Sequence, residues 1–346
     1  MKSIERIMSA MTGSTPDYQP FTLLLSLYGA SLLKCDTRDY YRDPNLWFEG
    51  QKAVVEHFDP DIMISPFSLP LEAEAFGSEI IMLNKFAPNV RKPIIKELSD
   101  IDKIQMPDCD NSPSLHFMIK TSALLAQSFQ GKKAIASLIP SPVDLPGVLM
   151  GAEMWVDTLL FYPKEVEKIL KITTEHFVRL GNTYLQNGTT FLVVSANFAN
   201  PTIITEKIFN FLLPHLQNAF SQIKGPIVVH HGGCKIVPFI DRYATLPNVA
   251  AMVIEHAESF AKAREIVGDK MVLMGNIDGP NLINLSPESA KEKTLKILND
   301  RKNDRHFIFA SSNADIAYDT PIETIMAVVD TIKQWRIDNG ELTVDN

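Results

Sequence analysis

The feature that most constrains the fold is a regular alternation that begins near residue 130 and continues to residue 335. Short apolar runs rich in β-branched residues alternate there with amphipathic stretches that have the period of an α-helix. This pattern is typical of βα units, in which helices cover a parallel sheet. The predicted strands are Ala134–Leu138, Thr190–Val194, Pro226–His230, Val249–Ile254, Met271–Met274 and His306–Ala310. The predicted helices lie near 163–187, 205–223, 236–243, 257–267, 287–299 and 321–335.

Six strands of this kind are many for an open sheet and favour a closed α/β architecture, the (β/α)8 TIM barrel. The first third of the chain is less regular. Pro60–Pro66 indicates an early strand and Leu71–Phe76 a short helix, whereas residues 78–130, with scattered prolines, are expected to leave the barrel as an excursion. We therefore expect a single (β/α)8-barrel domain over residues 1–346, with an N-terminal extension.

Composition limits the classes of partner. The formal net charge of −8 argues against nucleic acid, because phosphate contacts need clustered Lys and Arg, so a small molecule or another protein is expected. No apolar run reaches the roughly 20 residues of a membrane span, and the first residues lack the apolar core of a signal peptide. The three cysteines, Cys35, Cys109 and Cys234, occur singly, which suits a reducing compartment, and we expect a cytoplasmic protein.

Polar residues gather at the ends of five of the predicted strands. In a barrel of this kind the loops after the strand ends form the active site, so these residues carry the most weight. Their recurrence at equivalent places is the main indication of an enzyme. The five clusters are Ser195–Asn197, His230–Cys234, Glu255–His256, Gly275–Asp278 and Ser311–Asp315.

Two consecutive histidines form the most informative of these clusters. Adjacent strand residues point to opposite faces, so His230 and His231 cannot both face the barrel interior unless the strand has already ended. His230 is the candidate catalytic residue, with a hydrogen-bonded structural histidine as the alternative. Gly232 and Gly233 allow the backbone to approach a ligand. Cys234 is either a soft metal ligand or a small buried residue.

Carboxylates and amides at the other strand ends add further candidates. Glu255 can bind a metal, accept a proton or cap the next helix. Asp278 is a candidate catalytic residue and Asn276 a substrate-binding one, although turn chemistry alone selects Asn and Asp at such positions. The other candidate substrate-binding residues are Asn197, His231, Asn313 and Asp315.

Five segments together resemble the uroporphyrinogen decarboxylase superfamily, and within it the cobamide-dependent methyltransferase branch. That branch includes methylcobamide:coenzyme M methyltransferases and methyl-ether demethylases. The resemblance spans roughly residues 40–335, rests on the order and spacing of the segments, and implies the same (β/α)8 barrel. The segments are residues 40–58, 68–77, 228–233, 263–283 and 319–332.

Departures from the family pattern separate the branches. A porphyrinogen decarboxylase carries an early Arg-Gln-Ala-Gly-Arg segment and an Asp before its PLEA-like helix. This chain reads STPDYQPFTLLLSLYG in the early region and has Ser68 at the Asp position, so the resemblance argues against porphyrinogen decarboxylation. In the thiol-methylating branch, zinc is held by one His and two Cys. His230 matches the histidine, but Gly232 and Ala314 stand where the cysteines belong.

Two kinds of site remain open on this resemblance. One is a zinc site on His230, Cys234 and Glu255, and the other is a metal-free site. The metal-free site would consist of His230, Asn276, Asp278, Asn313 and Asp315.

The function implied is methyl transfer between a small methylated substrate, such as a methyl ether, methylamine or thiol, and the cobalt of a corrinoid on a partner protein. Two alternatives stay open. One is a decarboxylase or lyase acting on a non-porphyrin acid, for which Arg38, Arg42 and Arg91 are the available cations. The other is a non-catalytic barrel that binds a corrinoid or another ligand.

Overall fold

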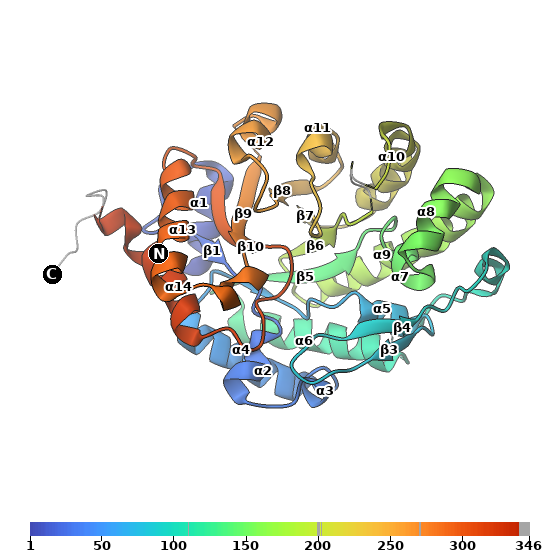
Figure 1. The fold of residues 1–346 in the computed structure, drawn as a ribbon, viewed down its shortest axis with the longest axis horizontal. Coiled ribbons are helices and arrows are strands. Elements are labelled where there is room, and N and C mark those ends of the chain that lie inside the picture. Colours follow the sequence, from blue (N-terminus) through green and yellow to red (C-terminus); the bar gives the residue numbers. More distant parts are fainter. Residues whose placement is uncertain (110, 199–200, 202, 270, 339–346) are drawn as a thin grey trace.

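The computed structural model describes the chain except for residues 110, 199–200, 202, 270 and 339–346. Its main sheet has eight parallel strands in the order β1-β10-β9-β8-β7-β6-β5-β2. Helices ring the strands on the outside (Figure 1), so the chain is a (β/α)8 barrel. The strands are β1 (Phe21–Thr22), β2 (Ile62–Ile64), β5 (Ala134–Pro140), β6 (Phe191–Ser195), β7 (Ile227–His230), β8 (Val249–Val253), β9 (Val272–Asp278) and β10 (Phe307–Ser312).

All six strands predicted after residue 130 are confirmed, with ends that differ by four residues or fewer. The predicted helices after residue 160 are confirmed as well. Ser286 caps α13, its side chain accepting the Ser289 N–H at 3.2 Å. The larger helices are α1 (Ser3–Thr12), α4 (Pro44–Phe58), α6 (Pro113–Phe129), α8 (Ala152–Phe161), α9 (Pro163–Gln186), α10 (Glu206–Ser221), α12 (Phe260–Val267), α13 (Pro287–Asp300) and α14 (Ile322–Asp338). The shorter ones are α2 (Tyr28–Leu33), α3 (Thr37–Tyr40), α5 (Pro70–Ala75), α7 (Leu145–Met150) and α11 (Ile240–Ala244).

The excursion expected at residues 78–130 is shorter than predicted. It consists of an antiparallel hairpin, β3 (Glu79–Ile81) with β4 (Asn89–Lys92), and a 3-10 turn at Leu98–Lys103. Helix α6, from the same segment, instead packs on α4, α5 and β5 as part of the outer ring. No helix in the described part of the chain has the length and apolar character that crossing a membrane requires.

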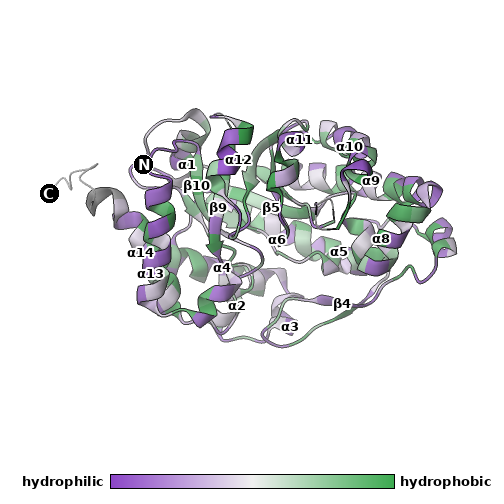
Figure 2. Cartoon of the chain, turned by 45° about the horizontal axis from the view of Figure 1, so that its top comes forward, coloured by the Kyte–Doolittle hydropathy of each residue, from purple (hydrophilic) through white to green (hydrophobic). Residues whose placement is uncertain are grey.

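Alternate residues of the strands fill the barrel interior. This inner cluster is separate from the larger core between strands and helices, and α1 closes its lower end with Ile7 and Ala10. Phe67 and Leu69 pack on it from the loop after β2. Figure 2 shows the apolar strands enclosed by helices with hydrophilic outer faces. The alternation that places Val228 inside also places His230 inside, two residues further along β7.

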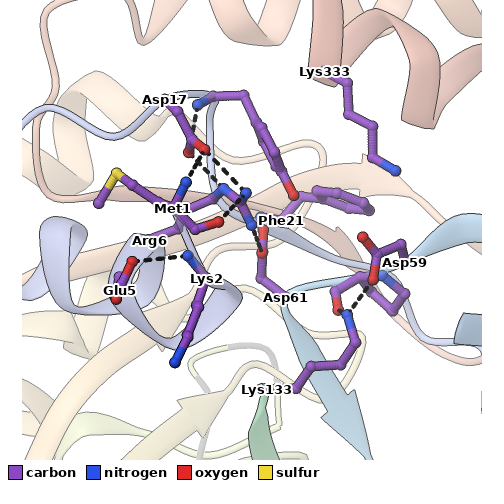
Figure 3. Close-up of polar contacts among 12 residues, drawn as sticks. Met1, Lys2, Glu5, Arg6, Asp17, Phe21, Asp59, Asp61, Lys133 and Lys333 are labelled. Carbon is purple, nitrogen blue, oxygen red and sulfur yellow. Dashed lines mark hydrogen bonds and ion pairs between the residues drawn. The ribbon is translucent and has the colours of Figure 1, made fainter. Parts of the chain in front are cut away.

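Side chains complete the closure of the barrel between β1 and β2, a boundary that we call the seam. The Asp61 N–H donates to the Phe21 carbonyl at 2.9 Å, and the Asp61 carboxylate accepts the Phe21 N–H at 3.0 Å. Arg6 of α1 reaches the same carboxylate at 2.9 Å and also binds Asp17 (Figure 3). Lys133 pairs with Asp59 and donates to the Pro60 carbonyl at 2.7 Å. The N-terminal end of the barrel is therefore held by the buried Arg6–Asp61 ion pair and by two partly exposed pairs, Arg6–Asp17 and Lys133–Asp59.

Candidate functional site

The sheet register brings the predicted residues to one end of the barrel. Ser195 of β6 pairs with His230, which in turn pairs with Val253, two residues before Glu255. On the next strands, Asn276 pairs with Ala310 and Asp278 with Ser312. Because neighbouring parallel strands end at the same edge, all the predicted clusters lie around the C-terminal mouth of the barrel.

His230 and His231 form a buried stacked pair, which we call the histidine pair. Their ring centroids lie 4.7 Å apart with an interplanar angle of 19°. Nδ1 of His230 accepts the Gly232 N–H, and Nδ1 of His231 accepts the Gly233 N–H, both at 3.0 Å. Burial lowers the pKa of His230 to about 4 and that of His231 to about 2. Both rings are therefore neutral at pH 7.

Nε2 of His230 is buried and has no hydrogen-bond partner among the described residues. Because Nδ1 already accepts a backbone N–H, the proton of the neutral ring sits on Nε2. His230 thus presents an unused N–H donor beneath Phe67, whose ring lies 5.5 Å away in an edge arrangement. A buried donor without a partner is costly, and a ligand that accepts from this N–H would remove that cost.

A second group of four polar residues lies closer to the surface, and we call it the mouth network. It consists of Glu255, His256, Asp278 and Asn313. His256 lies between two carboxylates, with Nδ1 beside Glu255 and Nε2 3.5 Å from Asp278. Asn313 donates to Asp278 at 3.0 Å. Its backbone nitrogen lies 3.2 Å from Nε2 of His231, so the mouth network is in contact with the histidine pair.

The remaining predicted residues have different surroundings. Asn276 donates to the Glu255 carbonyl at 3.1 Å and lies beside the mouth network. Asn197 packs against Gly232, where an added Cβ would lie 1.7 Å from the amide oxygen. Asp315 instead accepts the Leu27 N–H at 3.2 Å and holds the loop after β1, with burial raising its pKa to about 7.

The zinc that the resemblance implies does not fit the residues present. In the described chain, no group of three or more His, Cys, Asp or Glu side chains is placed to hold a metal. The Glu255 oxygens face His256 and the Ala257 N–H, and the Cys234 thiol lies 3.5 Å from the Asn197 carbonyl oxygen. Nε2 of His230 carries the ring proton. The metal-ligand hypothesis for His230, Cys234 and Glu255 therefore has no support in this geometry.

A cleft of about 420 Å³ opens beside the mouth network, between α12 and α13. His256, Asn276 and Asp278 line the end of the cleft at the barrel mouth, which we call its upper end, and the His256 side chain is 37% exposed. A small molecule can reach the mouth network from this cleft without any rearrangement of the core. The helix-capping alternative for Glu255 is wrong, because Ser259 caps α12.

Sequence reasoning missed two residues of the site. His256 was part of a predicted cluster but not a named candidate, although its place next to Glu255 at a strand end was a usable signal. Asp144, in the loop after β5, accepts the Ser195 hydroxyl at 2.8 Å and the N–H groups of Asn197 and Phe198 at 2.7 and 3.0 Å. Burial raises the pKa of Asp144 to about 6. It positions the loop after β6, and only the structure shows this.

The fold and the mouth together define a (β/α)8 barrel with a polar site at the C-terminal ends of its strands, the place where enzymes of this fold act. The family model described as uroporphyrinogen decarboxylase (URO-D) matches residues 2–335. The chain therefore belongs to the uroporphyrinogen decarboxylase family.

Individual relatives are distant and differ in activity. The chain is 22% identical to a uroporphyrinogen decarboxylase of Coxiella burnetii, over 87% of this chain and 85% of that protein. It is 23% identical to the methylcobamide:CoM methyltransferase MtaA of Methanosarcina barkeri, over 76% and 77% of the two chains. Among solved structures, a methyltransferase from Methanosarcina mazei superposes with a TM-score of 0.83 at 19% identity, covering 97% of this chain and 99% of that one.

Proposed function

We propose that this chain is a methyltransferase that moves a methyl group between a small methylated substrate and the cobalt of a corrinoid held by a separate protein. The similarity to a methylcobamide:CoM methyltransferase supports this activity within the family. The substrate is a methyl ether, methylamine or thiol. The observation that carries the proposal is the buried, unpartnered Nε2–H of His230, which suits a leaving heteroatom.

The alternative of a decarboxylase or lyase acting on a non-porphyrin acid is weakened, because the three arginines that the sequence offers for it are paired with carboxylates on the surface. Arg38 pairs with Asp36, Arg42 with Glu74 and Arg91 with Glu79. Ser68, where decarboxylases carry an Asp, is buried and its hydroxyl has no partner in the described chain. It cannot supply the negative charge of the missing carboxylate.

The residues of this chain act on the leaving group. In such a reaction the corrinoid of the partner protein would supply the electron pair that bonds to the methyl carbon. When the bond from methyl to the heteroatom breaks, the heteroatom keeps the bonding electron pair and gains negative charge. A neutral His230 stabilises that charge as a buried hydrogen-bond donor. The proton that completes the product comes from solvent.

Access to His230 depends on Phe67. The ring of Phe67 packs on His230, and because Nε2 of His230 is buried, a substrate reaches this atom only after side chains around it move, with Phe67 the nearest aromatic candidate. The mouth network then contacts the other end of the substrate, since Asp278 and His256 line the cleft.

The test uses the purified full chain with free cob(I)alamin and a panel of methyl ethers, methylamines and methyl thioethers. Consumption of cob(I)alamin, followed by its visible spectrum, is expected with one class of donor. A parallel assay supplies uroporphyrinogen. Decarboxylation of uroporphyrinogen, or no methyl transfer with any donor in either direction, contradicts the proposal.

A variant pair tests the role of His230. We expect His230→Gln to lower the rate of methyl transfer by about 100-fold, the usual effect of losing a preorganised donor. His215→Gln, on the outer face of α10 beside Glu167, is the matched control and should leave the rate unchanged. Equal rates in the two variants would show that His230 is structural only.

A further inference from the structure

The lower part of the α12–α13 cleft contains an arginine without an acidic partner. Arg301 follows α13, lines the cleft and places its guanidinium carbon 4.9 Å from the centre of the Phe260 ring. It is half-buried, and no ion pair or side-chain hydrogen bond of its guanidinium is found within the described chain. Burial lowers the pKa of Arg301, although the group stays charged at neutral pH.

The carboxylates near Arg301 do not neutralise it. Asp304 is engaged by Arg264, whose guanidinium binds both of its oxygens at 2.9–3.1 Å. Asp300 acts on the charge of Arg301 through space and forms no ion pair with it in the described structure. A half-buried guanidinium on an aromatic ring keeps its planar set of donors free for a carboxylate or phosphate.

Other charges along the cleft reinforce this preference. Lys293 and Lys296 lie one turn apart on α13, line the same cleft and have no ion-pair partner within the described residues. Glu258 also lines the cleft, but its carboxylate accepts the N–H groups of Ile236 and Val237 at 2.9 and 3.0 Å. The negative groups left are Asp278 at the upper end and Asp300 at the lower end.

We propose that the α12–α13 cleft binds the anionic group of a small-molecule substrate, a carboxylate or phosphate, through Arg301 with Lys293 and Lys296. This inference rests on the proposed function for the identity of the reacting group, and it adds the substrate class. One continuous cleft joins Arg301 to Asp278 and His256. A substrate anchored by its anion at Arg301 therefore extends its other end toward the mouth network.

The first experiment measures anion binding without methyl transfer. Phosphate, acetate and acetamide, the neutral analogue of acetate, are titrated calorimetrically into the full chain at low ionic strength. We expect phosphate and acetate to bind, acetamide not to bind, and added salt to weaken binding. Arg301→Gln should weaken binding at least tenfold, and Arg301→Lys should weaken it less, since the charge stays but the forked donors are lost.

Arg38→Gln is the matched control, because Arg38 is an exposed arginine paired with Asp36, away from the cleft. Its anion affinity should equal that of the wild-type chain. Circular dichroism and thermal unfolding show whether each variant is folded. Undiminished binding by folded Arg301→Gln, equal loss in Arg38→Gln, or no binding by the wild-type chain overturns the inference.

A kinetic comparison separates this inference from the proposed function. With an anionic methyl donor, Arg301→Gln should raise KM at least tenfold and leave kcat nearly unchanged, because the anchor lies away from the reacting bond. If anion binding depends on Arg301 but the chain transfers no methyl group, the anion-binding inference is supported and the proposed methyltransferase activity is contradicted. If the chain transfers methyl groups but anion binding does not depend on Arg301, the proposed activity is supported and the anion-binding inference is contradicted.

Discussion

The two rings of the histidine pair make the same hydrogen bond to the backbone but differ in the surroundings of their other nitrogen. Each ring accepts the N–H of the residue two positions later, and Gly232 and Gly233 permit the positive φ angles that this requires. Nε2 of His231 lies 3.2 Å from the backbone nitrogen of Asn313, whereas Nε2 of His230 has no partner in the described chain. The difference between the rings lies at this one atom.

The depressed pKa of His230 predicts a pH-dependent contribution to stability. Its folded value of about 4 lies below the ordinary 6.5, so its contribution is present above pH 6.5 and is lost as the pH falls toward 4. The stability of the wild-type chain relative to His230→Gln should fall by about 1.4 kcal/mol per pH unit in this window. Urea unfolding at several pH values measures it, and a constant difference would contradict it.

The two glycines after the histidine pair differ in their surroundings. Gly232 has a φ of +65°, and an added Cβ would overlap the Asn197 amide, whereas Gly233 has a φ of +83° and open space around it. We expect Gly232→Ala to cost about 3 kcal/mol of unfolding free energy, combining backbone strain and overpacking. Gly233→Ala should cost about 1 kcal/mol. Similar losses in the two variants, measured by urea unfolding, would show that the Asn197 contact is soft.

At the scale of elements, the regular part of the barrel could be predicted from sequence. Strands β5 to β10 and their helices follow a periodicity that burial on both faces of a parallel sheet imposes. Strand β1 has only two residues, Phe21 and Thr22, too few to show any periodicity. The α6 helix was placed in the excursion because nearby prolines hid its relation to the barrel.

The site was predicted in its location more than in its contacts. The rule that polar residues at strand ends form the active site placed His230, Glu255 and Asp278 at the mouth. The rule could not show that Asp315 turns away from the mouth network to accept the Leu27 N–H. The direction of a side chain beyond a strand end depends on the path of the loop. Asp144 was missed because its partners in the loop after β6 are 51 and more residues away in sequence.

The buried ion pair between α1 and the seam predicts that two arginine substitutions lower the free energy of unfolding by different amounts. Asp61 is fully buried, and Arg6→Met would leave its carboxylate without a cation, at a cost of about 3 kcal/mol. Arg42→Met breaks an exposed pair with Glu74 and should cost less than about 1 kcal/mol. Guanidinium unfolding compares them, and adding Asp61→Asn to Arg6→Met should recover part of the loss.

At the scale of the whole molecule, stability and chemistry are placed at opposite ends of the barrel. The N-terminal end holds α1 and the seam, and the C-terminal end holds the histidine pair and the mouth network, from which the cleft runs along α13 toward Arg301. The inner apolar cluster separates the two ends. Substitutions at one end should therefore have little effect on the property that depends on the other.

Ile7 provides the test of this separation. Ile7→Ala removes buried apolar atoms from the lower end of the barrel and should cost about 3 kcal/mol of unfolding free energy. At a temperature where the variant stays folded, its affinity for phosphate and its methyl-transfer rate should match those of the wild-type chain. A change in either would show that the lower end is coupled to the mouth.

The seam is also the place where the closed barrel opens most easily. Its neighbouring strands are linked by one backbone hydrogen bond together with carboxylate and hydroxyl contacts, in place of the regular ladder seen at β9 and β10. Parting β1 from β2 therefore breaks fewer main-chain bonds than parting any pair with a full ladder. In deuterium labelling of the native chain, the amides of Phe21 and Asp61 should exchange ahead of those in β9 and β10, through openings that leave the rest of the ring intact.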